Sequence, residues 1–112
     1  MIYHILPKAE WLEAKARGTY EPESVSIEGF IHCSTEQQFD QVANFYFKGH
    51  HHLVVIEIDD KKVADRLKWE SVGSQKFPHI YGPLDVHEVL READLIEGEE
   101  GLFEFPFKPV VH

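Results

Sequence analysis

The residue types best suited to chemistry are concentrated in one stretch, GFIHCSTEQQ, which covers residues 29–38. Its beginning has the composition of a short buried strand. Its end has the form of a capped helix start, because a serine or threonine is followed three residues later by a glutamine. A strand-to-helix turn presents unpaired backbone N–H groups and the positive end of a helix dipole, so it suits an anionic group of a ligand. The side chains at this turn that can donate, accept, titrate or attack are His32, Cys33, Ser34 and Thr35.

Cys33 is a candidate nucleophile, because a helix N-terminus and the adjacent His32 can both lower the pKa of a thiol. A lone cysteine between a strand and a helix is more often a buried packing residue, which leaves His32 and Ser34 as the stronger candidates. Cys33 is also the single cysteine of the sequence. No internal disulfide can form, and the chain fits a reducing compartment, by default the cytoplasm.

Two further histidines stand at predicted strand ends or in constrained turns, His4 near the N-terminus and His79 within FPHIYGPL. Imidazole serves as a general acid or base, a hydrogen-bond partner or a metal ligand near neutral pH. Each histidine alone is more often structural, but His4, His32 and His79 would form a site if the fold brought them together. Three converging histidines would also suit a metal-dependent hydrolase, which we keep as a less favoured alternative.

Other side chains have weaker claims to a role. The run at residues 50–52 (HHH) invites a metal interpretation, but adjacent side chains point in different directions and the ligand spacing typical of zinc sites is absent. Tyr3, Tyr81 and Trp69 could stack on a planar base, although aromatic residues in strands usually belong to the core. Glu70 could orient a ribose or a cationic centre only if the fold brings it to the histidines.

Composition limits the partners. The 112 residues predict one domain, 1–112, and the hydrophobic content of 43% is ordinary for a folded chain. The formal net charge of −9 disfavours an extended nucleic acid, which binds through lysine and arginine. No apolar run approaches the roughly 18 residues of a membrane span, so no membrane partner is expected. A small nucleotide-like ligand remains compatible, because local N–H groups and histidines can hold it.

The elements that must position these residues follow from periodicity and turn chemistry. Residues 19–28 lack a clear period and are predicted to form a loop, and residues 85–96 fit a helix or a strand. The stretch 53–58 is the strongest strand and should be central and buried on both faces. This order predicts an α+β domain with mainly antiparallel sheets and two helices in its N-terminal half. Strands are predicted at 2–6, 30–33, 53–58, 67–72 and 102–105, and helices at 8–17 and 35–47.

The chain resembles a bacterial family known as domain of unknown function 952. The similarity covers nearly the whole chain in order, at residues 2–5 (IYHI), 28–34 (EGFIHCS), 69–70 (WE), 77–84 (FPHIYGPL), 101–103 (GLF) and 105–106 (FP). That family is grouped by fold with the ADP-ribosyltransferase-like domains, which bind NAD between two split antiparallel sheets. The resemblance therefore implies an ADP-ribosyltransferase-like fold, a strand rather than a helix at residues 86–94, and NAD as the ligand.

The resemblance also implies a layout for the site. In the transferases a first-strand histidine contacts the nicotinamide-side ribose, and His4 stands at the matching place. His32 replaces the aromatic residue that stacks on nicotinamide. The catalytic glutamate of a late strand would fall near His79, where this sequence has no acid. That departure matters because a carboxylate stabilises the cationic centre that forms as nicotinamide leaves, and imidazole does not.

The leading expectation is a histidine-lined cleft that binds NAD or a related nucleotide and transfers ADP-ribose or cleaves a glycosidic bond. His4 and Ser34 would hold ribose hydroxyls, the turn after Cys33 would hold phosphate, and His79 would act as acid, base or orienting group. The alternative is a nucleotide-binding module without catalysis, which the missing late-strand acid favours. The candidate residues are His4, His32, His79 and Glu70 for catalysis, and Tyr3, Ser34, Thr35 and Tyr81 for binding.

Overall fold

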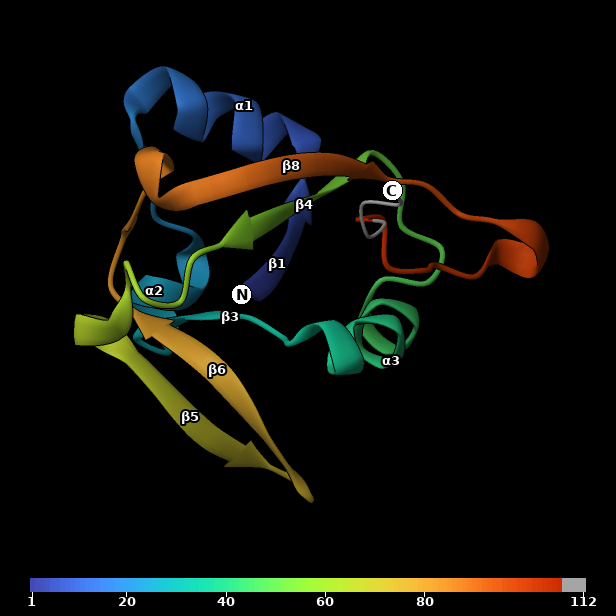
Figure 1. Ribbon diagram of the computed structural model, residues 1–112. Coiled ribbons are helices and arrows are strands. Elements are labelled where there is room, and N and C mark those ends of the chain that lie inside the picture. The colour runs from blue at the N-terminus through green and yellow to red at the C-terminus, as the bar shows by residue number, and fades with distance from the viewer. Residues whose placement is uncertain (108–112) are drawn as a thin grey trace, which may run out of the picture.

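The computed structural model describes residues 1–107, which form two three-stranded antiparallel sheets and one two-stranded pair. Figure 1 shows the first sheet in the upper half of the molecule and the second in the lower half. The first sheet has the order β1-β4-β8 and the second β3-β6-β5, while β2 pairs with β7. The strands are β1 (Ile2–Pro7), β2 (Thr19–Tyr20), β3 (Phe30–His32), β4 (Leu53–Ile58), β5 (Leu67–Val72), β6 (Gln75–Tyr81), β7 (Leu84–Asp85) and β8 (Val89–Leu95).

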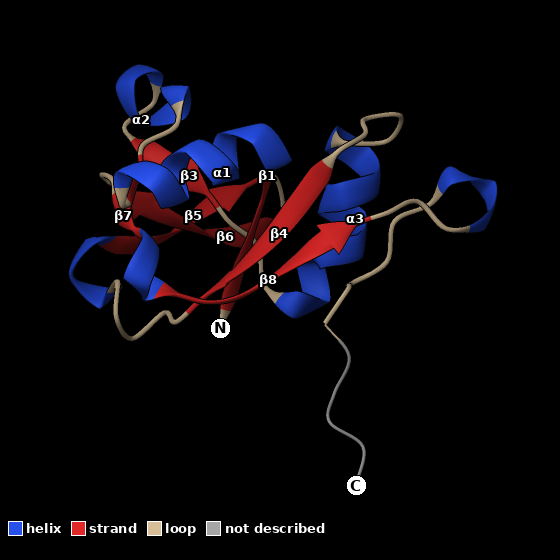
Figure 2. Ribbon diagram, turned by 90° about the horizontal axis from the view of Figure 1, so that it is seen from above, coloured by secondary structure: helices blue, strands red, loops and turns tan. Residues whose placement is uncertain are grey.

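Three α-helices accompany these sheets: α1 (Lys8–Arg17), α2 (Glu23–Ile27) and α3 (Glu36–Tyr46). Figure 2 shows α1 lying across the sheet and α3 standing at its side. Short 3₁₀ turns occur at Ala64–Arg66, Val86–Glu88 and Glu99–Gly101. The predicted single α+β domain is therefore correct. None of the helices in the described part of the chain is long and apolar enough to cross a membrane.

The alternating side chains of β1 and β4 divide the core into two clusters. Ile2 and Leu6 pack with Trp11 of α1 and with residues of the second sheet. Tyr3 and Ile5, on the other face of β1, pack with α3 and with the segment 103–107. Because side chains alternate along a strand, a nearly continuous apolar strand can serve both clusters. All six residues of β4 are buried, which confirms the prediction of a central strand.

The strand-to-helix turn at residues 32–36 has the predicted form. Thr35 is the N-cap of α3: its hydroxyl accepts from the backbone N–H of Gln38, whose side chain in turn accepts from the N–H of Thr35. Ser34 just before it exchanges two backbone hydrogen bonds of 2.8 Å with Tyr3 of β1. This bridge ties the end of β3 to the first sheet, so the chemistry-bearing turn lies against β1.

Two predictions about secondary structure are wrong. Residues 19–28 are not a continuous loop but contain β2 and α2, elements too short to produce a readable period. Residues 102–105 form no strand, because the backbone N–H groups of Phe103 and Phe105 donate to the side chains of Asn44 and Asp40 on α3. The number of helices in the N-terminal half is therefore three rather than two.

The ambiguous stretch 85–96 is mostly a strand. Asp85 and Glu88 form a capping box around one 3₁₀ turn, and β8 follows over Val89–Leu95. The strand implied by the family resemblance at residues 86–94 is thus present but begins three residues later. The apolar spacing that resembled a helix combines Val86 of the 3₁₀ turn with Val89, Leu90 and Ala93 of β8.

Candidate functional site

A cavity of about 340 Å³ lies between α3 and the β5–β6 hairpin, against β1 and the end of β3. Its size is near the lower end of the roughly 300–1,000 Å³ typical of ligand pockets. Most of its wall is apolar or aromatic, and its polar side chains cluster on the β1–β3–β6 side. The polar lining residues on that side are Tyr3, His4, His32, Cys33, Ser34 and His79. The other lining residues are Ile5, Val42, Tyr46, Phe47, Val72 and Phe77.

The register of β3 on β6 brings two of the predicted histidines together. His32 lies directly opposite His79, and the centroids of their rings are 5.4 Å apart. Phe30, two residues earlier on the same face of β3, stacks on the His79 ring at 4.0 Å with an interplanar angle of 15°. Directly opposed residues in an antiparallel pair project to the same face of the sheet. The pairing of the second sheet therefore builds one wall of the cavity.

His79 is held by a carboxylate. Its Nδ1 lies 2.8 Å from Oε1 of Glu70 on the neighbouring strand β5, and the Tyr81 hydroxyl donates to the same oxygen. These two hydrogen bonds, that of Tyr81 first, hold the pKa of Glu70 below its usual value. The ionised carboxylate can only accept, so Nδ1 carries the proton. The imidazole is buried, and its Nε2 makes no hydrogen bond within residues 1–107.

A histidine in this state has an oriented ring and an available lone pair on Nε2. The same arrangement, with a carboxylate on Nδ1 and a free Nε2, prepares imidazole to act as a general base. Glu70 itself does not line the cavity. It contacts the lining residue His79 instead, and its charge is already engaged by two donors.

His4 also reaches the cavity, but both of its nitrogens are occupied. Nδ1 donates to the backbone carbonyl of His32 at 2.6 Å, because a carbonyl can only accept. Nε2 then accepts from the hydroxyl of Tyr20 at 2.8 Å. Burial lowers the pKa of His4 to about 4, so the ring is neutral at physiological pH. His4 therefore contributes a ring to the cavity wall and holds the carbonyl of His32 in place.

Tyr20 was not among the predicted site residues. It lies in the two-residue strand β2, inside a segment that the sequence led us to expect as a loop. Its side chain is buried, and burial raises the pKa of its hydroxyl above the usual value. A protonated hydroxyl is the donor that a neutral His4 requires. An aromatic residue just after Gly18, in an otherwise polar stretch, is the signal that could have indicated a buried role.

The two hydroxyl residues of the turn have different positions. Ser34 is 3% exposed and lines the cavity, and its hydroxyl makes no hydrogen bond within the described chain. Thr35 does not line the cavity, since its hydroxyl caps α3. Cys33 is buried beside them, and burial raises the pKa of its thiol, which therefore stays protonated. The preference for His32 and Ser34 over Cys33 agrees with this arrangement.

Tyr3 and Tyr81 contribute less than the sequence suggested. The Tyr3 ring forms part of the wall, but its hydroxyl donates to buried Glu57 at 2.9 Å on the other side. Tyr81 lies outside the lining and donates to Glu70. Trp69 is 47% exposed and does not line the cavity either. The other aromatic lining residues are Tyr46 and Phe47 at the end of α3 and Phe77 of the hairpin, which the sequence analysis did not select.

Within residues 1–107, no group of three or more His, Cys, Asp or Glu side chains is arranged to hold a metal ion. Both His4 nitrogens are also engaged in hydrogen bonds, so His4 has no free nitrogen to offer a metal. The histidines at 50–52 line a different cavity, next to Lys8 and Glu97. The described residues give no support to a metal-dependent hydrolase.

The fold and the cavity together define a small α+β protein with a largely apolar pocket between α3 and the β5–β6 hairpin, bordered by three histidines. The chain belongs to the family described as "Protein of unknown function (DUF952)", whose model matches residues 5–92. The family resemblance inferred from the sequence motifs is therefore confirmed. None of the curated proteins matches the chain.

Solved structures of one relative, protein CC0527 from Caulobacter crescentus, share the fold. Its crystal structure is 42% identical, with a TM-score of 0.85 and 92% of each chain covered. A crystal structure of its double mutant gives a TM-score of 0.84 at the same identity and coverage. The solution NMR structure is 43% identical, covers 90% of this chain and 89% of that one, and has a TM-score of 0.81.

Proposed function

We propose that this protein binds a nucleotide-like ligand, NAD among the candidates, with a base and a ribose in the histidine-lined pocket. The observation that carries the proposal is that His4, His32 and His79 border one cavity, together with Ser34, whose hydroxyl makes no hydrogen bond within residues 1–107. Pockets of this kind, apolar with a few polar groups on one wall, are typical of small-ligand sites. The sequence resemblance to ADP-ribosyltransferase-like domains supports a nucleotide over other small molecules.

The dimensions of the cavity limit which part of NAD it can hold. About 340 Å³ suits one ring with its sugar, so most of a dinucleotide would lie outside. Phe47, Tyr46 and Phe77 supply aromatic surface for a planar base. Ser34 and His79 supply the polar groups for ribose hydroxyls. The residues therefore fit a nucleoside portion of NAD.

We further propose that any chemistry is transfer of ADP-ribose or cleavage of a glycosidic bond, with His79 as the acid or base. Its Nε2 is free while Glu70 holds Nδ1, so the ring can accept a proton from an attacking hydroxyl or water. Glu70 and Tyr81 are positioning residues in this scheme. The ADP-ribosyltransferase-like fold assignment belongs to the same proposal.

The catalytic half is tested by incubating the purified protein with NAD and measuring nicotinamide release. We expect release that falls at least 100-fold in His79→Ala, the loss typical when a general base is removed. His87→Ala, at an exposed position outside the pocket, is the matched control and should retain activity. Absence of release by the native protein, or equal release by both variants, rejects catalysis at this site.

A binding module without catalysis is the second candidate. The described lining contains no carboxylate, and Glu70, which holds the lining residue His79, is already engaged by His79 and Tyr81. A site with no free acid lacks the group that stabilises a developing positive charge. Calorimetric binding of a nucleotide without turnover would support this candidate, and absence of binding by any nucleotide would reject both.

A further inference from the structure

We infer that the pocket recognises the base and sugar of its ligand and makes no use of phosphate. The ligand class is therefore an uncharged nucleoside, or the nucleoside end of a larger molecule that lies partly outside the pocket. This inference rests on the proposed function and narrows it. Its first support is the lining itself. No Lys, Arg, Asp or Glu lines the cavity among residues 1–107. Phosphate recognition in proteins relies on cationic side chains or free backbone N–H groups.

The pocket histidines do not supply the missing positive charge. His32 Nε2 lies 3.1 Å from Oε1 of Glu28, and His79 Nδ1 lies 2.8 Å from Oε1 of Glu70. Each of these rings, when protonated, therefore has its charge balanced by its own carboxylate. His4 is neutral, because burial lowers its pKa to about 4. The imidazole cluster as a whole presents no uncompensated cation.

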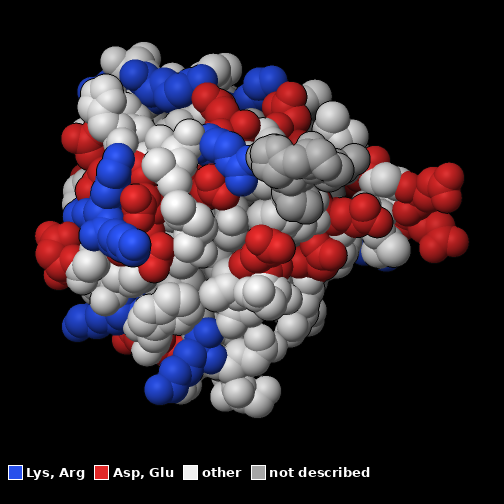
Figure 3. Space-filling model, in the orientation of Figure 1, with Lys and Arg blue, Asp and Glu red and all other residues white. Residues whose placement is uncertain are grey.

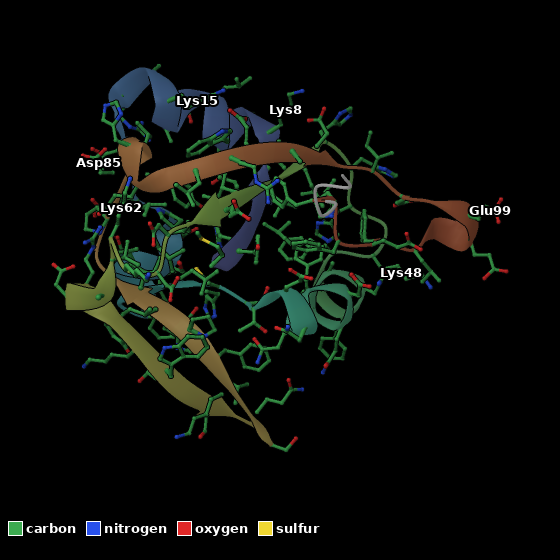
Figure 4. All side chains as sticks on the ribbon, viewed as in Figure 1. Lys8, Lys15, Lys48, Lys62, Asp85 and Glu99 are labelled. Atoms are coloured by element: carbon green, nitrogen blue, oxygen red, sulfur yellow. The ribbon has the colours of Figure 1, made fainter. Side chains whose placement is uncertain are left out.

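The neighbouring lysines do not reach the cavity. Lys68 is engaged, with its Nζ 4.8 Å from the centroid of the Tyr81 ring. Lys48 and Lys76 adjoin the lining residues Phe47 and Phe77 in the chain, but neither lines the cavity. In Figure 4, Lys48 lies on the side of α3 away from the β5–β6 hairpin. A phosphate in the pocket would lose its hydration without gaining a cationic partner.

The start of α3 does not compensate for this absence. The Thr35–Gln38 capping box already occupies donors at the helix N-terminus, and the acidic Glu36 stands in the first turn. The expected phosphate site after Cys33 thus has a negative charge beside it. The electrostatic field of the whole protein also disfavours a phosphate, since the chain carries a net charge of −9. Figure 3 shows part of this excess as a group of acidic side chains at the far right.

Calorimetry with matched ligand pairs tests the inference: adenosine, inosine and uridine, each against its 5′-monophosphate, and NAD. We expect at least one nucleoside to bind within about threefold of its monophosphate, or more tightly. The Kd should change less than twofold between 50 and 500 mM salt, because screening acts on charged contacts. Tighter binding of a monophosphate or of NAD, by tenfold or more over the nucleoside, overturns the inference but leaves the proposed function standing. Absence of binding by every ligand rejects both.

A pair of variants locates the recognition in this cavity. Val72 lines it and is 49% exposed at the hairpin end, so Val72→Arg adds a cation at the rim without burying it. We expect this variant to favour AMP over adenosine by at least tenfold relative to the native protein. Leu90→Arg, at a 41% exposed position on β8 outside the lining, is the matched control and should not change the ratio. An unchanged ratio in a folded Val72→Arg protein contradicts the inference.

Discussion

Glu70 Oε1 and His79 Nδ1 lie 2.8 Å apart across the β5–β6 pair, and this contact orients the buried imidazole of His79 in the pocket and leaves its Nε2 available. Glu70 faces Phe77 in the register, so it is diagonal to His79 on the same face of the sheet. Diagonal neighbours in a sheet are within reach of long side chains. The contact therefore depends on the register, which a one-residue slip would abolish.

Glu70→Gln should change the His79 tautomer. The amide can offer its NH₂ group to Nδ1, so the strict preference for a proton on Nδ1 is lost. We expect ¹⁵N NMR spectra at pH 8 to show a larger population with the proton on Nε2. Glu99→Gln, in the 3₁₀ turn far from the pocket, is the control. An unchanged tautomer in Glu70→Gln would show that the carboxylate does not orient the ring.

Tyr81→Phe should raise the pKa of the Glu70 carboxyl. The hydrogen bond from the Tyr81 hydroxyl is the largest cause that holds this pKa below its usual value, and only His79 and the charge of Lys68 remain to lower it in the variant. A carboxyl whose pKa is lowered in the folded state stabilises the fold above the unfolded pKa, and this contribution is lost as pH falls. The variant should therefore lose less stability on acidification. A ¹³C NMR titration of Glu70 measures the shift, and a pKa equal to or below the native one contradicts it.

The stability of the fold should fall as His4 is forced to ionise. Burial lowers the pKa of His4 to about 4 in the folded protein, against about 6.5 in an unfolded chain. The unfolded state then binds more protons between these values, so stability decreases as pH falls from about 6.5 to 4, by up to about 3 kcal/mol. His4→Gln removes this part of the pH dependence of stability, because glutamine does not titrate.

Urea unfolding at pH 7, 5.5 and 4.5 measures this loss in the native protein and in His4→Gln. The difference between the two proteins isolates His4 from the carboxyl groups, which titrate in both. His87→Gln, at an exposed position, is the control and should follow the native curve. Parallel curves for native protein and His4→Gln would mean that His4 is not held neutral by its surroundings.

Arg91→Ala should destabilise the protein strongly. Glu57 is 5% exposed on the central strand and accepts two hydrogen bonds of 2.8 Å from Arg91 and one from Tyr3. Arg91 is the largest cause that holds the pKa of Glu57 below its usual value. Removing one partner of such a pair leaves a buried charge and costs about 3 kcal/mol or more. Urea unfolding at pH 7 should show this loss; Arg17→Ala, at the exposed end of α1, should cost less than about 0.5 kcal/mol.

Much of the scaffold was predictable because its main elements have strong local signals. The strand at Leu53–Ile58 and the helix at Lys8–Arg17, ended by Gly18 with φ 91°, match their predicted bounds. The capping box at Thr35 marked the start of α3. Elements of two to five residues, such as β2 and α2, carry no such signal, since a period needs more residues to be visible.

The site was predictable as a set of residue types but not as a set of contacts. His32 and His79 were selected because histidines in constrained turns are capable of chemistry, and β3–β6 pairing then joined them. The engagement of His4 by Tyr20 could not be inferred, because it depends on where a two-residue strand meets β1. Likewise, alternation in FEF at 103–105 resembled a strand, while the decisive partners were side chains of α3 some 60 positions away.

Asn44→Ala should therefore release the segment that follows Gly101. The Asn44 side chain makes two hydrogen bonds to the backbone of Phe103, accepting at 2.8 Å from its N–H and donating at 2.9 Å to its carbonyl. Phe103 is 1% exposed and packs in the core beside Phe39. Losing both bonds leaves the backbone groups of Phe103 without partners, which costs about 1–3 kcal/mol.

Amide hydrogen exchange distinguishes this release from a general loss of stability. The amides of Phe103 and Phe105 should exchange at least tenfold faster in Asn44→Ala. The exchange rates of the amides of the central strand β4 should change only as much as the global stability of the protein changes. Gln37→Ala, at an exposed position in the first turn of the same helix, is the matched control. Unchanged protection at Phe103 in Asn44→Ala would show that apolar packing alone holds the segment, and that the hydrogen bonds from Asn44 do not determine its position.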